Sequence, residues 1–278
     1  MRILYSLAAA IGLAYGSPVV ANACGTGEQA CEVADGSYFV AMPEGEPTGL
    51  VLWLHGAGGS GSKAAANEGF TRNFREAGLV FVAPQGEQVW PNGKVMRDWS
   101  VADGIDDSRD DVAFLSAVVA DAVNRFELEG KPLLLAGFSR GGSMAWDLAC
   151  ARPDLFDAVA PVAGGFWEPM ERDCAAPVHI FHTHGFSDRM VPLEGRQGTW
   201  QGFHFHQGNI LKGLDIWRET NGCLGAADEH ASEEGLWQKR WTGCAGGSIT
   251  LQITPRGHGI PKGWSGRVLE WFDSVTEG

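Results

Sequence analysis

One serine in this chain stands where it could act as a nucleophile. The stretch GFSRGG, residues 137–142, places Ser139 between glycines, after an apolar run and before small and apolar residues. A strand that turns tightly into a helix lifts a serine hydroxyl above the edge of a sheet, and Gly137 and Gly141 leave room for that turn. The pattern favours nucleophilic catalysis by Ser139 over a structural serine in a glycine-rich bend.

A serine hydroxyl becomes nucleophilic when a histidine that is oriented by a carboxylate removes its proton. In sheets with this kind of turn, the acid and the base follow the nucleophile on loops after later strands. The stretch THGFSDRMVP follows a predicted strand and supplies Asp188, and TPRGHGIPKGW follows another and supplies His258. We expect these two residues to complete the site, with Glu194 and Asp215 as alternatives for the acid.

The tetrahedral intermediate of such a reaction needs two backbone amides aimed at its oxyanion. The residue after the nucleophile, Arg140, is expected to supply one amide. The loop LHGAGGSGS, which follows a predicted strand, is expected to supply the other. Within it Ala57 is our first choice and Gly58 the second.

Strand-like and helix-like stretches alternate along the chain and would bring these loops to one edge of a sheet. Apolar runs predict strands at 37–42, 49–54, 79–84, 132–138, 157–164, 177–183 and 248–254, and periodicity predicts helices at 63–77, 110–126, 141–153, 208–220 and 263–275. The first two strands would form a hairpin, and 85–108 a long loop. We therefore predict an α/β class fold: one domain, a three-layer sandwich with a mostly parallel central sheet.

Composition and charge limit the partners that the protein can have. The chain has 278 residues, 44% of them hydrophobic, which suits one large globular domain. Its formal net charge of −13 repels phosphate backbones and anionic lipid surfaces. Nucleic acid is excluded as a partner on this ground.

The first residues have the pattern of an export signal. A positive charge precedes an apolar stretch too short to span a membrane, and Ala21, Asn22 and Ala23 form a small-x-small cleavage site. We predict a signal peptide over 1–23 and a mature catalytic domain over 24–278, secreted or periplasmic, with no membrane span. Cys24 after the cleavage site also fits a lipid anchor, but Ala21 replaces the larger aliphatic residue usual in such signals, so we favour the unlipidated form.

Six cysteines remain in the mature chain, and an even number in an exported protein favours disulfides. We expect neighbours to pair, each closing a short loop: Cys24 with Cys31, Cys150 with Cys174, and Cys223 with Cys244. A zinc site is disfavoured because no two cysteines have the C-x-x-C spacing.

Histidines and aromatic residues raise two further questions. His182 and His184 share one face of a predicted strand and His179 lies on the other, so we predict no metal site. Aromatic residues gather in the predicted loops: Trp90, Trp99, Phe166, Trp167, Trp200, Phe203, Phe205 and Trp264. They favour a flat or apolar substrate group, and we single out Trp99 and Trp264 as substrate-binding residues.

Taken in order, LHGAGGSGS, DDVAFL, GFSRGGSMAW, HTHGFSD and GHGIPKGW resemble motifs of the α/β-hydrolase esterases grouped with polyhydroxybutyrate depolymerases and feruloyl and acetylxylan esterases. The resemblance implies an α/β-hydrolase fold, a triad on Ser139, Asp188 and His258, and an acyl-enzyme mechanism without a cofactor. The chain departs from it at Ala57, where depolymerases often have cysteine, and at Ile260, where they often have tryptophan.

These departures favour small or oligomeric soluble esters over solid polymer as substrates. The sequence predicts a secreted serine carboxylic-ester hydrolase that acts on short hydroxyalkanoate oligomers or on phenolic or acetyl esters. Two alternatives stay open: a serine peptidase of the same fold, and a hydrolase-fold protein that binds partners without catalysis.

Overall fold

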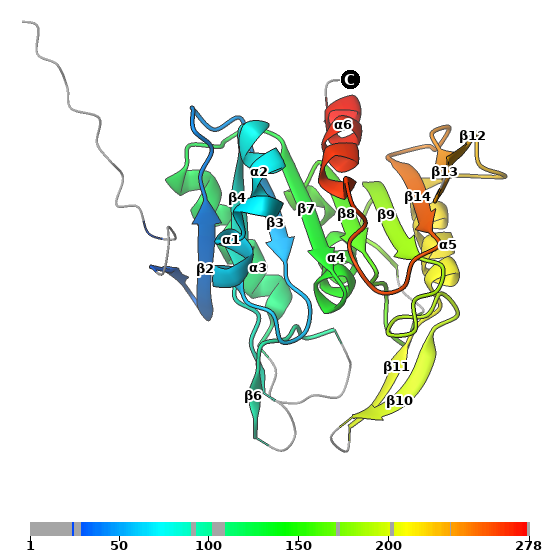
Figure 1. Ribbon diagram of the computed structural model, residues 1–278, viewed down its shortest axis with the longest axis horizontal. Coiled ribbons are helices and arrows are strands. Elements are labelled where there is room, and N and C mark those ends of the chain that lie inside the picture. Colours follow the sequence, from blue (N-terminus) through cyan, green and yellow to red (C-terminus); the bar gives the residue numbers. More distant parts are fainter. Residues whose placement is uncertain are drawn as a thin grey trace, which may run out of the picture.

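The computed structural model has a large central sheet with helices on both of its faces (Figure 1). It describes residue 24 and residues 29–89, 93–101, 109–170, 173–200, 203–233 and 235–276, with the side chains at 200 and 203 left out. The predicted signal peptide, 1–23, lies outside the described residues. Among those that are described, no helix has the length and apolar character needed to cross a membrane.

The sheet has ten strands, in the order β1-β2-β4-β3-β7-β8-β9-β14-β13-β12. These strands are β1 (Cys31–Val33), β2 (Gly36–Ala41), β3 (Gly49–Leu54), β4 (Leu79–Pro84), β7 (Leu133–Phe138), β8 (Ala158–Val162), β9 (His179–Gly185), β12 (Glu229–Glu233), β13 (Leu236–Trp241) and β14 (Ser248–Thr254). The six central strands from β4 to β14 are parallel, and the pairs toward both edges are antiparallel. The predicted sandwich with a mostly parallel sheet is confirmed.

Five of the helices lie in connections between the parallel strands, and the last one follows β14. They are α1 (Gly61–Ala65), α2 (Glu68–Glu76), α3 (Asp111–Arg125), α4 (Arg140–Ala151), α5 (Ile210–Asn221) and α6 (Trp264–Thr276), with a short 3₁₀ helix at Pro153–Leu155. Two small hairpins stand apart from the sheet: β5 (Gln88–Val89) with β6 (Val95–Met96), and β10 (Arg196–Trp200) with β11 (Phe203–Gln207). Figure 1 shows both hairpins extending from the same end of the sheet.

Two local predictions were wrong. The strands at 37–42 and 49–54 do not form a hairpin, because β4 lies between β2 and β3 and pairs with both. The expected loop over 85–108 contains the β5–β6 hairpin, and residues 102–108 of it lie outside the described residues. Both errors concern antiparallel pairings, which the alternation of strands and helices does not specify.

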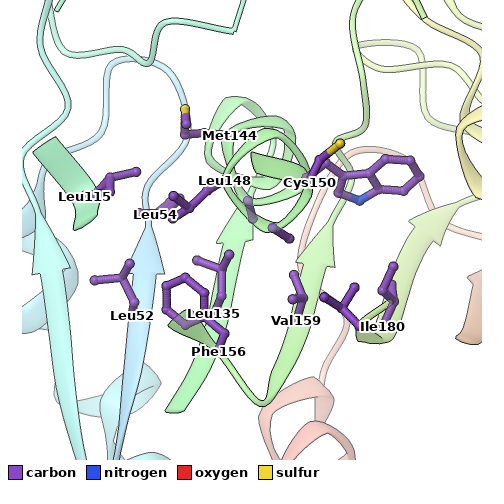
Figure 2. Packing of buried hydrophobic residues seen from close by; sticks show 14 of the residues in the cluster. Leu52, Leu54, Leu115, Leu135, Met144, Leu148, Cys150, Phe156, Val159 and Ile180 are labelled. Atoms are coloured by element: carbon purple, nitrogen blue, oxygen red, sulfur yellow. The ribbon is translucent and has the colours of Figure 1, made fainter. Parts of the chain in front are cut away.

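Side chains on successive residues of β3, β4, β7, β8 and β9 enter two separate cores. On β3, Leu50, Leu52 and Leu54 belong to one apolar cluster, and Val51 and Trp53 belong to the other. The first cluster packs under α3, α4 and α5, as Figure 2 shows for part of it, and the second packs under α2 and α6. Burial on both faces explains why the central strands read as continuous apolar runs in the sequence.

Three disulfides close short loops on this scaffold, and they join the expected partners: Cys24 with Cys31, Cys150 with Cys174, and Cys223 with Cys244. The second of them ties the end of α4 to the segment that leads into β9. Each cross-link restricts the unfolded chain and so stabilises the fold.

The packing of α4 against β3 generates a stability prediction. A methyl group on Gly141 would overlap the carbonyl oxygen of Leu54, whereas one on Gly266 in α6 would meet nothing within 4 Å. We expect Gly141→Ala to lower the free energy of unfolding by about 3 kcal/mol or more, because both backbones are fixed by the core.

The matched control, Gly266→Ala, is expected to raise that free energy by about 0.5–1 kcal/mol, because alanine restricts the unfolded chain and favours the helix. Urea unfolding of the two variants and the wild type measures both effects. Equal stabilities for the two variants would contradict the packing argument.

Candidate active site

Ser139 occupies the turn between β7 and α4. Its backbone has φ 57° and ψ −120°, which costs a residue with a side chain about 1–3 kcal/mol. Its N–H donates to the carbonyl of Val162 at 2.9 Å, and its own carbonyl accepts from the N–H of Ser143 at 2.9 Å. The Ser139 hydroxyl stands at the N-cap of α4 but makes no capping bond to the helix, so it remains available for another partner.

Glycines make this turn sterically feasible. A Cβ on Gly137 would overlap the carbonyl oxygen of Gly141. A Cβ on Gly142 would lie 2.7 Å from the carbonyl oxygen of Val162. The motif therefore contains glycine where backbone meets backbone, as the sequence suggested.

The imidazole of His258 lies between Ser139 and Asp188. Its Nε2 is 3.0 Å from Ser139 Oγ, and its Nδ1 is 2.7 Å from Asp188 Oδ2. A carboxylate oxygen only accepts, so Nδ1 carries the proton and Nε2 of the neutral ring faces the hydroxyl with a lone pair. Of the alternative acids, Asp215 forms an exposed ion pair on α5 and Glu194 is exposed.

The three residues meet because parallel strands end at one edge of the sheet. Ser139 follows β7, Asp188 follows β9 and His258 follows β14. Strands β9 and β14 are direct neighbours, paired from His179 with Ser248 to Gly185 with Thr254. Their two loops therefore leave the sheet side by side and can hold an acid and a base in contact.

The side chain of Asp188 is held by hydrogen bonds from its own loop as well as from His258. Its Oδ1 accepts from the amides of Met190 and Val191 at 2.8 and 2.9 Å. Burial would raise the pKa of Asp188, but the bonds from His258 and from these two amides outweigh it, so the pKa lies below its usual value. The carboxylate therefore stays ionised at neutral pH.

Two buried histidines support the turn that carries Asp188. His184 lies 1% exposed and donates from Nε2 to the carbonyl of Val191 at 2.8 Å. Its Nδ1 must then accept, so His182, fully buried, donates from Nε2 across 3.1 Å. Both rings are neutral in this arrangement, and burial lowers the pKa of each, that of His182 well below its usual value.

The loop after β3 approaches Ser139 from the other side. Gly58 N–H donates to Arg97 at 2.7 Å, and Gly59 N–H to Gly56 at 2.9 Å. The Ala57 amide has no partner among the described residues, and Ala57 lines the pocket beside Ser139. Ala57 thus fits an oxyanion donor better than Gly58, whose N–H is already used.

A buried polar network holds this loop in place. Trp99 donates from Nε1 to the carbonyl of His55 at 2.7 Å, and His55 Nε2 accepts from the amide of Gly86 at 3.0 Å. The Arg140 side chain bonds Asp98 at 2.9 Å and the carbonyl of Trp99 at 3.1 Å. The side chain of Arg140 is therefore occupied, while its backbone lies at the start of α4 beside Ser139.

A pocket of about 510 Å³ opens beside Ser139. Its wall combines the turn at Ser139 and the loop that carries Asp188 with the β10–β11 hairpin. Its lining residues are Ala57, Asp98, Ser139, Arg140, Ser143, Trp167, Met190, Val191, Arg196, Gly198, Thr199, Phe205 and Gln207. The rings of Trp167 and Phe205 lie 5.6 Å apart between centroids and form an aromatic side of the pocket. A flat or apolar substrate group fits such a surface.

The expected roles of Trp99 and Trp264 in substrate binding were wrong. Trp99 is fully buried and supports the loop after β3, and Trp264, 1% exposed, packs beneath the sheet with Trp53 and Phe70. Neither lines the pocket. Trp90 and the side chains at 200 and 203 lie outside the described residues.

The sequence did not lead us to expect Arg196 at the pocket, because we predicted no hairpin at these residues. The signal was the alternation of large and polar residues in 203–207, which is typical of a strand. Within the described ranges, no three histidine, cysteine or acidic side chains are grouped so that they could hold a metal ion.

The chain is similar in sequence to one protein family and to named esterases, and it spans only 44% to 66% of the length of the first of these relatives. Residues 35–207 match the family model described as phospholipase/carboxylesterase. The chain is 32% identical over 160 residues to the putative esterase NocK of Nocardia uniformis subsp. tsuyamanensis, a match over 56% of this chain and 44% of that protein. It is 26% identical over 221 residues to feruloyl esterase C of Emericella nidulans, covering 74% of this chain and 76% of that one.

Solved structures agree on the fold. The acetyl xylan esterase from Aspergillus awamori superposes with a TM-score of 0.64 at 14% identity, covering 86% of this chain and 94% of that one. The Bacillus cereus carboxylesterase superposes with a TM-score of 0.58 at 14% identity, over 87% of this chain and 95% of that one. At these identities the likeness establishes the α/β-hydrolase fold.

The buried histidines generate a pH prediction. Below about pH 6.5 the unfolded chain binds protons on these two rings and the folded chain does not. Each ring therefore lowers the free energy of unfolding by about 1.4 kcal/mol for every unit by which the pH falls. We expect His182→Gln to reduce the change of the unfolding free energy with pH between about pH 5 and 6.5 by the contribution of one histidine. Urea unfolding at several pH values measures the slope.

The slope of His182→Gln must be compared with that of a second variant. Burial raises the pKa of Asp111 to about 6, and the titration of that carboxyl changes the free energy of unfolding with pH in the opposite direction. His230→Gln, at an exposed position on β12, provides the matched control for the substitution itself. If both variants keep the wild-type slope, His182 is not a buried neutral ring.

Proposed function

The chain belongs to the phospholipase/carboxylesterase family, and from that premise we propose that it is a serine esterase that hydrolyses carboxylic esters through an acyl-enzyme. One observation carries the proposal: Ser139 Oγ, His258 and Asp188 form a continuous hydrogen-bonded chain, with 3.0 Å at the nucleophile and 2.7 Å at the acid. The side chain of Ser139 has the base that an otherwise weak nucleophile requires.

The first half-reaction forms the acyl-enzyme. His258 Nε2 takes the proton as Ser139 Oγ attacks the ester carbonyl, and the carbonyl oxygen becomes an oxyanion that the amides of Ala57 and Arg140 stabilise. The intermediate collapses, the bond to the alcohol oxygen breaks, and His258 returns its proton to the leaving alcohol. Asp188 keeps the imidazole in the reactive tautomer and stabilises its charged form.

The second half-reaction releases the acid. A water molecule gives a proton to His258 Nε2 while its oxygen attacks the acyl carbonyl, and a second oxyanion forms at the same amides. Collapse breaks the bond to Ser139 Oγ, which takes back the proton from His258. The products are the free acid and the unchanged enzyme.

The substrate that we propose is a short hydroxyalkanoate oligomer or a phenolic or acetyl ester. The aromatic side of the pocket, Trp167 and Phe205, supports a flat or apolar group. Relatives named as feruloyl esterase support a phenolic ester among these.

The nucleophile is tested by covalent labelling. We expect a fluorophosphonate to add its mass to the peptide that contains Ser139, because the reagent needs an activated serine. Ser139→Ala should lose both the label and the turnover of 4-nitrophenyl acetate, and His258→Gln should reduce turnover by at least about 10³-fold.

Ser143, which lines the same pocket, supplies the matched control: Ser143→Ala should keep the label and most of the turnover. Labelling elsewhere in an active protein would refute the assignment. Measuring the turnover of peptide amides beside that of esters distinguishes an esterase from a peptidase. Turnover of amides at the rate of esters would contradict the proposal.

We also propose that the protein is exported after removal of residues 1–23. The three disulfides support this location, because disulfides persist in oxidising compartments. They also favour the unlipidated form, since the sulfur of Cys24 is bonded to Cys31 and is not available for a lipid thioether.

The export proposal is tested by the mass of the mature protein. When the full chain is produced in a bacterium, the periplasmic or medium fraction should contain a species that begins at Cys24 with all six thiols oxidised. An added lipid mass on Cys24, or an uncleaved chain that stays in the cytosol, would contradict it.

A further inference from the structure

The pocket beside Ser139 contains two arginines, and only one of them is neutralised. The guanidinium of Arg140 is bonded to buried Asp98 at 2.9 Å. Arg196 donates from Nε to Gln207 Oε1 at 2.9 Å, and no carboxylate within the described part of the chain forms an ion pair with it. Its terminal nitrogens remain as donors on a wall of the pocket.

The position of Arg196 is fixed by stacking as well as by that hydrogen bond. Its guanidinium lies 5.2 Å from the centroid of the Phe205 ring, and Arg140 lies 4.3 Å from that of Trp167. With the two rings in contact, the order along the wall is arginine, tryptophan, phenylalanine, arginine. A flat group that lies along this wall ends next to Arg196.

The hairpin that carries Arg196 is built to hold this surface. Gly198 faces Phe205 across the two strands, and a Cβ on Gly198 would overlap the Phe205 ring, so the glycine lets the ring lie across the hairpin. Strand β11 is also joined to the Trp167 segment, since Glu168 N–H donates to the carbonyl of His206 at 3.0 Å. The guanidinium is thus positioned before a ligand binds.

We propose that Arg196 is a specificity-determining residue that binds a carboxylate on the substrate, so that the preferred ester has a flat group with an anionic end remote from the reacting carbonyl. The inference rests on the proposed esterase function and narrows its substrate class. A guanidinium without a carboxylate partner attracts such a group, and its planar N–H groups match the two oxygens. In a chain of net charge −13, this local cation also opposes the general repulsion of anions.

The test uses pairs of probes that differ only in charge. Methyl 4-carboxycinnamate and methyl 4-carbamoylcinnamate place a carboxylate or its neutral amide on the acid side of the ester. The acetates of 4-hydroxybenzoic acid and 4-hydroxybenzamide place them on the alcohol side. Both pairs are measured for turnover with the active protein and for binding to Ser139→Ala by calorimetry.

In at least one pair, the wild type is expected to favour the carboxylate by roughly 10-fold in kcat/KM, mainly through KM, and by a similar factor in binding. Arg196→Gln should abolish the preference, so that the two members of each pair have similar kcat/KM and similar affinity. Added salt should reduce the preference, because the site is partly exposed. Arg240→Gln removes the same charge from β13, outside the pocket, and should leave the preference intact.

The outcomes separate this inference from the proposed function. Binding that favours the carboxylate in Ser139→Ala and depends on Arg196, without turnover of any ester, would overturn the esterase and retain the anion site. Turnover of the neutral esters with no preference in either pair, or a preference that persists in Arg196→Gln, would overturn the anion site and retain the esterase.

Discussion

The close approach of three backbone segments at the end of β7 is the constraint on which the site depends. The carbonyls of Leu54 and Val162 lie against Gly141 and Gly142, so the first turn of α4 is pressed between β3 and β8. Ser139 is forced to a positive φ in the process. A strained residue of this kind persists only when the surrounding structure determines its conformation, and here two buried strands and a buried helix do so. The strain directs the hydroxyl away from its own helix and toward His258.

Buried polar groups on both sides of Ser139 extend this fixed geometry. His184 and His182 support the turn of Asp188, and the Asp98–Arg140 pair and Trp99 support the loop after β3. Such groups are costly to bury and contribute little net stability, because they exchange hydrogen bonds to water for hydrogen bonds within the protein. Their contribution is positional, because each one orients a group that faces the pocket. An apolar core could not supply the hydrogen bonds that these groups need.

Most of the fold and the candidate triad could be predicted because both depend on local patterns. Continuous apolar strands, the glycines around Ser139, and the loops after two later strands were readable in the sequence. The roles of Trp99 and Trp264 were not, since a tryptophan near a loop in the sequence can equally fill a core, and only the tertiary structure shows which N–H groups have buried partners. The β10–β11 hairpin was missed because its pairing is antiparallel and independent of the strand–helix alternation.

That hairpin lies apart from the strands that carry Ser139, Asp188 and His258. The proposed triad and the loop after β3 are attached to central strands of the parallel sheet. Arg196 and Phe205 belong to a two-stranded element that, among the described residues, pairs with no strand of that sheet. A substitution in the hairpin can therefore change the wall of the pocket without moving Ser139 or His258. Arg196 and Phe205 are nonetheless held in place, Arg196 by its hydrogen bond to Gln207 and Phe205 by its contact with Trp167. Loops and hairpins can change freely only when the reacting groups do not depend on them, and this arrangement meets that condition.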